Sequence, residues 1–179
     1  MSVKNNWADI NKDACPYTSS FYSYLGMAIG VSFACLGSAF GTAKAGKGVV
    51  AAGVMKPQQA MKNTLPVIMA GVLGIYGLII AIVINTSVST YKSTVVPLFI
   101  SYGHLSAGIC TGIASLSAGI SIGIAGNAGA RANARNQKLF VVMLLILVFG
   151  EALALYGLII GLILCFKTID MKAVCGIDN

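Results

Sequence analysis

Four long apolar stretches alternate with short polar segments along this chain of 179 residues. The apolar stretches cover residues 21–43, 64–84, 98–126 and 139–166. Each is long enough for a helix that rises ~1.5 Å per residue to cross ~30 Å of hydrocarbon. The regular alternation of polar and apolar positions found in membrane β-barrels is absent. The pattern therefore predicts an all-α membrane protein with four transmembrane helices.

Polar segments flank and separate these stretches. The predicted organisation is an N-terminal tail (1–20), a first helical hairpin (21–84), a connecting loop (85–97), a second hairpin (98–166) and a C-terminal tail (167–179). Because the N-terminal tail is polar, we expect no cleavable signal peptide. Little sequence lies outside the predicted spans, so we expect no soluble catalytic domain.

The two predicted hairpins repeat each other. The sequence IYGLII at 75–80 returns as LYGLII at 155–160, which is 80 residues later. Glycines with a common 4-7-4 spacing mark the first and third spans, at an offset of 82: Gly26, Gly30, Gly37, Gly41 and Gly108, Gly112, Gly119, Gly123. We interpret this as the duplication of one hairpin, with a two-residue length difference in the loops after the first and third spans. Both copies run in the same direction, so their symmetry axis lies along the membrane normal, as in a ring or rotor.

The glycines of each span lie on one face of its helix. At ~100° per residue, their directions fall within about 60° of one another. Small residues let helix backbones approach closely, which drives helix association in lipid. Two arrangements fit: close packing inside a four-helix monomer, or a crowded concentric ring with the first and third spans inside. The same spacing on two equivalent helices favours the ring.

Basic residues are concentrated in two of the polar segments. Hydrophobic residues make up 57% of the chain and charged residues 9%, with a formal net charge of +7. Most basic side chains lie after the first or the third span: Lys44, Lys47, Lys56, Lys62, Arg131, Arg135 and Lys138. The positive-inside rule places these segments in the cytosol, and both tails and the loop 85–97 on the luminal side. The charge reports membrane topology, and we expect no nucleic-acid partner.

Three other features are weaker candidates for sites. The segment GTAKAGK (41–47) resembles a P-loop, but Gly48 replaces the Ser or Thr that binds Mg²⁺ and no strand precedes the segment. His104 has no cysteine or acidic companions, so we expect a packing histidine near the membrane interface and no metal site. Cys15 and Cys175 lie on the same predicted side of the membrane, where a disulfide between them is feasible.

Glu151 lies in the middle of the fourth apolar stretch and is the only glutamate in the chain. A charged side chain at the centre of a bilayer costs ~2.5–3.5 kcal/mol on insertion scales, and such residues usually serve ion or proton paths. The offset of 80 pairs Glu151 with Gly71, so only the second hairpin carries the acid. We predict that Tyr156 hydrogen-bonds Glu151 from the same or a neighbouring helix, and we interpret Tyr76 as a packing residue. The alternative is a protonated glutamate with a purely structural hydrogen bond.

Three further segments contain family-specific motifs. They are GTAKAGKGVVAAGVMKP at 41–57, GIAGNAGARANA at 123–134 and QKLFVVMLLILVFGEALALYGLIIGLIL at 137–164. Together they resemble the proteolipid c-subunit of eukaryotic vacuolar-type proton ATPases, over residues 21–166. The resemblance implies a rotor ring of many copies, each carrying one proton on the carboxylate of Glu151, with Tyr156 at the matching tyrosine position. The sequence departs from the family at Asn127, where many relatives have Asp, and in its longer N-terminal tail.

The resemblance also implies partners and a location. ATP hydrolysis takes place on other subunits, so the isolated chain is not expected to be an enzyme or to need a cofactor. The a-subunit of the stator supplies an arginine, and the d-subunit, which is the connector of the central stalk, lies on the cytosolic side. There we expect Lys56 and Arg135 to make contact. The implied location is a vacuolar or other acidifying endomembrane.

The nature of the transported ion follows from the second span. Sodium-binding rings of the family surround the carboxylate with Gln and Thr oxygens from that span, whereas residues 67–73 here contain no side-chain oxygen. A hard cation needs several oxygen ligands, so we predict a proton. Two other classes stay open: a small multidrug-type exchanger, which would place its acid in the first span, and a structural tetraspan pore protein, for which Glu151 would be dispensable.

Overall fold

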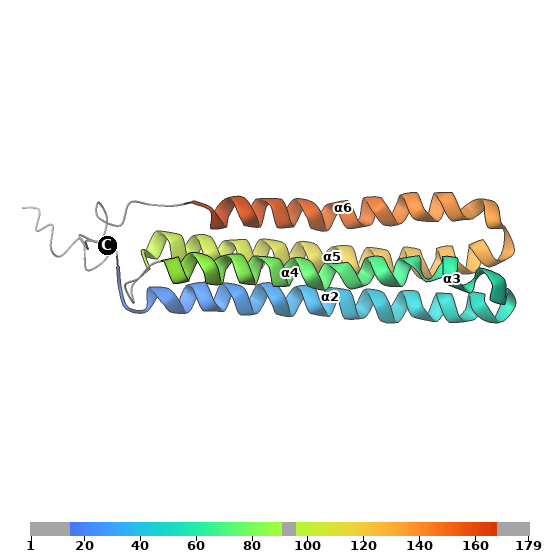
Figure 1. Ribbon diagram of the computed structural model, residues 1–179, viewed down its shortest axis with the longest axis horizontal. Helices are drawn as coiled ribbons and strands as arrows, with labels where there is room; N and C mark the ends of the chain where they lie inside the picture. The colour runs from blue at the N-terminus through green and yellow to red at the C-terminus, as the bar shows by residue number, and fades with distance from the viewer. Residues whose placement is uncertain (1–14, 91–95, 168–179) are drawn as a thin grey trace, which may run out of the picture.

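Four long helices dominate the computed structural model (Figure 1), which describes residues 15–90 and 96–167. In chain order the elements are α2 (Ser19–Met55), η1 (Pro57–Gln59), α3 (Ala60–Asn63), α4 (Leu65–Thr90), α5 (Leu98–Arg135), η2 (Gln137–Leu139) and α6 (Phe140–Cys165). Four helical segments are long and apolar enough to cross a membrane. The structure therefore confirms the predicted architecture of four membrane helices.

The first helix of each hairpin, α2 or α5, is longer than predicted. α2 continues past residue 43 to Met55, and α5 continues past residue 126 to Arg135. Neither extension contains a proline, and α2 ends only where Lys56 adopts an extended backbone before Pro57. A residue before proline is pushed out of the helical conformation, which explains this end point. The two predicted basic loops are therefore mostly helical, and the connections are short turns.

The predicted loop 85–97 is also partly helical, because α4 continues to Thr90. The Thr86 and Ser89 hydroxyls donate hydrogen bonds to the carbonyls of Ile82 and Asn85, each one turn earlier, at 2.8 Å. Because these hydroxyl groups form hydrogen bonds to the backbone of their own helix, the helix can continue through polar residues. The hydropathy pattern thus ends at residue 84 although the helix does not.

The two hairpins turn in the same way. Lys56 and Asn136 lie 80 residues apart and both have extended backbones, with φ and ψ of −144° and 91° in one and −140° and 110° in the other. Each is followed by a three-residue 3₁₀ turn, η1 or η2. The predicted two-residue length difference between these connections is therefore wrong. The repeat offset is 80 throughout the hairpins.

The offset of 82 between the glycines arises because they face each other across one contact between α2 and α5. A Cβ atom at Gly37 would lie 2.6 Å from the Ser115 carbonyl oxygen, and one at Gly41 would lie 2.9 Å from that of Gly119. Facing pairs include Gly26 with Gly108, Gly30 with Gly112, Gly37 with Gly119 and Gly41 with Gly123. The two glycine stripes thus form a single contact inside one chain, which is the monomer packing left open above.

The second helix of each hairpin packs on the first through the same pair of residues. A Cβ atom at Gly77 of α4 would lie 2.5 Å from Ala34 of α2, and one at Gly157 of α6 would meet Ala114 of α5, in each case 80 residues later. α4 and α6 meet each other over an apolar core. The largest fully buried apolar side chains of this core are Leu73, Ile80, Ile84, Ile122 and Leu147.

Candidate functional site

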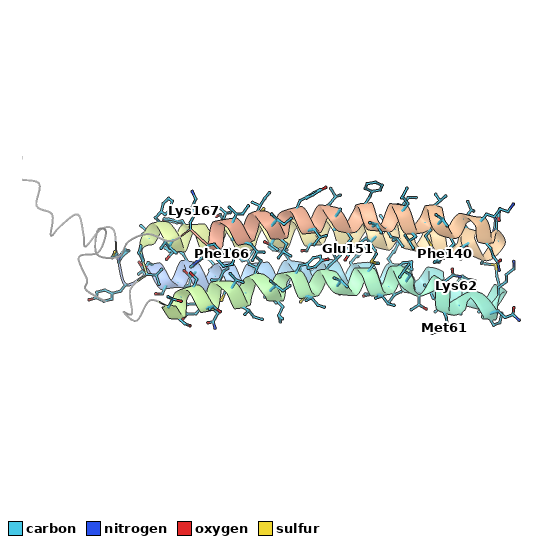
Figure 2. The ribbon with its side chains drawn as sticks, turned by 45° about the horizontal axis from the view of Figure 1, so that its top comes forward. Met61, Lys62, Phe140, Glu151, Phe166 and Lys167 are labelled. Atoms are coloured by element: carbon cyan, nitrogen blue, oxygen red, sulfur yellow. The ribbon has the colours of Figure 1, made fainter. Side chains whose placement is uncertain are left out.

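Glu151 lies near the middle of α6. Figure 2 shows it between Phe140 at one end of the helix and Phe166 at the other. At ~1.5 Å per residue, these ends are about 16 Å and about 22 Å away. Glu151 is the only acidic side chain in the described segments 15–90 and 96–167. The single acid of the membrane helices is therefore held far from both ends of the bundle.

The side chain of Glu151 stands on the boundary between the buried and exposed faces of α6. Leu147 and Ala154, one turn before and after it, are fully buried. Val148 and Leu155, on the other flank, are 46% and 38% exposed. Glu151 itself is half-buried. A group in this position can be reached from outside the chain without opening the bundle.

Tyr76 is the partner of Glu151. Its hydroxyl, on α4, donates a hydrogen bond of 2.8 Å to the Oε1 atom of Glu151. Tyr76 is only 9% exposed, so packing holds its ring in place. A phenolic hydroxyl can donate to a carboxylate or accept from a protonated carboxyl. This contact can therefore accompany either form of the acid.

Tyr156, the tyrosine predicted to fill this role, does not make the contact within the chain. Its side chain is 61% exposed. Residues five apart on a helix point about 140° away from each other, so Tyr156 cannot face the same side as Glu151. The prediction that Tyr156 hydrogen-bonds Glu151 from the same helix is therefore wrong. Within the chain the hydrogen-bond partner of Glu151 is Tyr76, which we had interpreted only as a packing residue.

The repeat contained a signal for Tyr76. The second and fourth spans are antiparallel to the first and third, so α4 and α6 run side by side in the same direction. Tyr76 and Tyr156 occupy the same position in the YGLII motif that α4 and α6 share. The missing information was which of the two tyrosines lies between α4 and α6 inside the chain.

Gly71 occupies the position in α4 that Glu151 occupies in α6. It is exposed, and a Cβ atom added to it would have no neighbour within 4 Å. The first hairpin thus has neither an acid nor an intramolecular contact at this point. The four described membrane helices therefore provide one carboxyl group.

Glu151 has no cationic partner in the part of the chain that the structure describes, since it makes no ion pair there. Figure 2 places Lys62 and Lys167 at opposite ends of the bundle, far from Glu151.

His104 is more deeply buried than the sequence suggested. Its side chain is fully buried, and its Nδ1 atom lies 3.0 Å from the hydroxyl of Ser23 across the α2–α5 contact. His104 is therefore a packing residue, as predicted, and its position near the membrane interface stays a prediction.

Two other weak candidates can be placed. Residues 41–47 lie within the continuous helix α2, so their backbone N–H groups are engaged in helical bonds and cannot cradle a phosphate. Cys15 is disulfide-bonded, whereas Cys35 and Cys110 are free. Cys175, the predicted partner of Cys15, lies outside the described residues.

Lys56 and Arg135 lie at the same end of the bundle. Lys56 caps the C-terminal end of α2, and Arg135 is the last residue of α5. Both side chains are exposed. The structure brings them close to the two hairpin turns, and their predicted contact with a stalk stays a prediction.

Comparison with known families agrees with the repeat seen in the structure. Two segments, residues 25–84 and 105–164, each match the family of the ATP synthase C subunit. The second match begins and ends 80 residues after the first, which is the offset of the hairpin turns. Members are membrane subunits that form the rotor ring of proton-translocating rotary ATPases and have no ATP-hydrolysing site. With two tandem copies of this domain, the chain belongs to the ATP synthase C-subunit family.

Proposed function

We propose that the chain is the proteolipid c-subunit of a vacuolar-type ATPase, and that Glu151 carries the proton. The observation that carries the proposal is the 2.8 Å hydrogen bond from Tyr76, which holds the only glutamate in place at mid-bundle. Because an acid at this depth is costly, a purely structural role would be served as well by a neutral residue. Two tandem hairpins of which only the second carries an acid in its membrane helices further support the vacuolar type.

In the proposed cycle Glu151 faces lipid in its protonated, neutral form. Ionisation takes place only where a stator provides water and a positive charge. We assign that charge to an arginine of the stator a-subunit, since Glu151 makes no ion pair within the described residues. Rotation, driven by ATP hydrolysis on other subunits, then carries each newly protonated site away. Moving one charge against 100 mV takes ~2.3 kcal/mol, which the ATP-hydrolysing subunits must supply.

The proposed ion is a proton rather than sodium. The Tyr76 hydroxyl places one oxygen next to the carboxylate. This oxygen comes from outside residues 67–73, which contain no side-chain oxygen. One hydroxyl and one carboxylate are still few ligands for a hard cation, which takes several oxygens. A desolvated carboxyl group is instead neutralised by a proton.

The direction and the cytosolic partner follow from the charges. By the positive-inside rule, the basic ends of both hairpins face the cytosol. In the proposed cycle, ATP hydrolysis on the cytosolic side drives protons from the cytosol to the lumen of an acidifying endomembrane. Lys56 and Arg135 are exposed at these ends and suit contact with the d-subunit that connects the ring to the central stalk.

The decisive experiment replaces Glu151 with Gln in the complete ATPase. Glutamine keeps the volume and can still accept from Tyr76, but it cannot release a proton. We expect normal insertion and ring assembly, measured as ring mass in mild detergent, together with a complete loss of ATP-driven vesicle acidification. Gln at the repeat position, Gly71→Gln, is the matched control and should leave part or all of the acidification.

Acidification by the Glu151→Gln variant would refute the assignment and leave the glutamate as a structural hydrogen-bonding residue. Dimers instead of rings would favour the exchanger class. Carbodiimides attack neutral carboxyl groups, so labelling of the wild-type protein should be lost in Glu151→Gln.

A further inference from the structure

A small polar cavity lies between the two hairpins, at the end of the bundle where both of them turn. It has a volume of about 170 Å³ and is lined by Lys62 of α3, Asn133 of α5, Gln137 of η2 and Phe140 of α6. Figure 2 shows Lys62 and Phe140 close together at this end, well away from Glu151. The proposed proton path uses none of the four lining residues.

The wall of the cavity contains a buried amide whose hydrogen bonding is incomplete. Asn133 is 2% exposed, and its Nδ2 atom donates a hydrogen bond of 2.6 Å to the Oδ1 atom of Asn63, which is 0% exposed. Among the described residues, the two remaining amide atoms, Asn133 Oδ1 and Asn63 Nδ2, have no hydrogen-bond partner. Buried polar groups are nearly always hydrogen-bonded, and leaving one unpaired costs free energy. Because Asn133 lines the cavity, a group bound there can supply the missing partner.

The hairpin turn itself does not require these polar side chains. Gly53 and Pro57 occupy the positions of Asn133 and Gln137 in the first hairpin, 80 residues earlier. That hairpin nevertheless ends its first helix with the same extended residue and the same three-residue 3₁₀ turn. The two amides of the second hairpin are therefore not needed to form the turn and are available for another role.

The charge of the cavity favours an anion. Lys62 contributes a positive charge, and Glu151, near mid-bundle, is the only acidic side chain in residues 15–90 and 96–167. Phosphate oxygens accept charge-assisted hydrogen bonds from ammonium groups and further bonds from amide N–H groups, which Lys62 and Gln137 can provide. A hydroxyl group both donates and accepts, so it can pair with whichever amide atom Asn133 turns to the cavity.

We propose that this cavity binds a phosphate ester that carries a hydroxyl group. The phosphate lies at Lys62 and Gln137, and the hydroxyl group completes the hydrogen bonding of Asn133. Pockets for ordinary small molecules have volumes of ~300 Å³ or more, so a cavity of about 170 Å³ suits a phosphoglycerol group rather than a nucleotide.

The surroundings favour the headgroup of a phospholipid over a free phosphate ester. Met61 and Val141 adjoin Lys62 and Phe140 in the sequence and are 86% and 70% exposed. Acyl chains can cover these apolar side chains while the headgroup enters the cavity. Basic pockets between membrane helices on the cytosolic side are a known way to bind anionic headgroups. We therefore assign the ligand to an anionic phospholipid with a glycerol headgroup, in the leaflet on the side of the hairpin turns.

A lipid titration of the assembled protein tests the proposal. The protein is purified in detergent, stripped of lipid and incubated with one dioleoyl lipid at a time, and the bound lipid per chain is counted by native mass spectrometry. We expect phosphatidylglycerol to bind most tightly, because phosphatidic acid has the phosphate without an alcohol group and phosphatidylcholine has no net negative charge. Free glycerol 3-phosphate at the same concentration should compete only weakly, since it lacks acyl chains.

Three variants locate the binding at the cavity. Lys62→Gln should raise the apparent Kd for phosphatidylglycerol by roughly tenfold, as expected for loss of a hydrogen bond to a charged group. Gln137→Pro should raise it by a smaller factor, and this variant should fold because the first hairpin has proline here and the extended backbone of Asn136 suits a following proline. Lys138→Gln removes the same charge from the same turn outside the cavity lining, so it is the matched control and should change little.

The proposal would be overturned by equal affinity for phosphatidylglycerol and phosphatidylcholine, by no loss in Lys62→Gln, or by an equal loss in Lys138→Gln. Equal affinity for phosphatidic acid would refute the hydroxyl contact with Asn133, and strong competition by glycerol 3-phosphate would refute the lipid assignment. Glu151→Gln should leave lipid binding unchanged while acidification is lost. The failure of this inference and the failure of the proposed function are therefore distinguishable.

Discussion

The two hairpins share a scaffold and differ in chemistry. Gly77 meets Ala34 in the first and Gly157 meets Ala114 in the second, so the helix contact is retained after duplication. The acid is present at only one of the equivalent positions, as Glu151 on α6. A buried acid is costly at each site where it occurs, whereas small residues at helix contacts are needed in both halves. The comparison teaches that the helix packing occurs in both hairpins, whereas the acid occurs in only one.

The largest effect is expected from a bulky residue in the α2–α5 contact, which joins the two hairpins. Leucine at Gly37 would strike the backbone of Leu116, and leucine at Gly119 would strike that of Gly37. Overpacking costs ~1–3 kcal/mol or more, and backbone cannot move aside like a flexible side chain. We expect both variants to be lost from membranes to a similar extent, measured by immunoblot of the membrane fraction.

Gly53→Ala is the control for these variants, because its Cβ atom would make ordinary contact with Ala60 at 3.7 Å. Normal levels of either leucine variant would show that the contact is not as close as described. Loss of only one of them would show that the two sides of the contact are not equally close.

Adding an acid to the first hairpin tests the difference in chemistry. Gly71→Glu places a carboxyl group where no Cβ neighbour exists in the chain. We expect carbodiimide labelling per chain to rise about twofold, since each protonated carboxyl at mid-bilayer is a target. Labelling at the wild-type level would mean that the first hairpin cannot hold a neutral acid, and the difference would then extend beyond residue 71.

Replacing each of the two tyrosines should have unequal effects on the rate of acidification, and both effects should be smaller than those above. Tyr76→Phe removes the donor to Glu151, and a hydrogen bond to a charged group contributes ~1.5–3 kcal/mol, so the rate of acidification should fall by roughly tenfold or more. Tyr156→Phe, the same change in the other hairpin, should have little effect. Equal losses in the two variants, measured as initial acidification rates at constant ring content, would return Tyr156 to the carboxyl site.

Charge reversal at the hairpin turns should have the smallest effect. Lys56→Glu and Arg135→Glu change exposed side chains at the hairpin turns. We expect intact rings but weaker attachment of the stalk, seen as fewer ATP-hydrolysing subunits retained on washed membranes at moderate salt. Unchanged retention and coupling in the double variant would assign these charges to topology alone.

The helices and the acid could be predicted from the sequence, whereas their exact ends and contacts could not. Hydropathy marks the apolar part of a helix and not its end. The predicted spans therefore ended at residues 43 and 84, whereas α2 and α4 end at Met55 and Thr90. Glu151 was evident from its depth. Its partner was not, because Tyr76 lies 75 positions away and depends on how α4 meets α6.

The repeat offset shows a related limit. Glycines 82 residues apart stand out in the sequence because both are glycines, although the equivalent residues 80 apart are only similarly small. Gly26, for example, corresponds to Ser106 and faces Gly108. The identical glycines thus marked the contact between α2 and α5, whereas the YGLII motif and the hairpin turns mark the repeat.

The close joining of α2 and α5 has a mechanical consequence. Their contact runs from Gly26 to Gly48, which meets Asn127, a length of about 33 Å at ~1.5 Å per residue. Two rods bonded along their length resist bending more than the same rods lying loose, because neither can slide past the other. Interlocked backbones without a proline between residues 19 and 55 therefore form a stiff beam that stores little elastic energy under load. Torque applied at its end is passed along the beam with little lag.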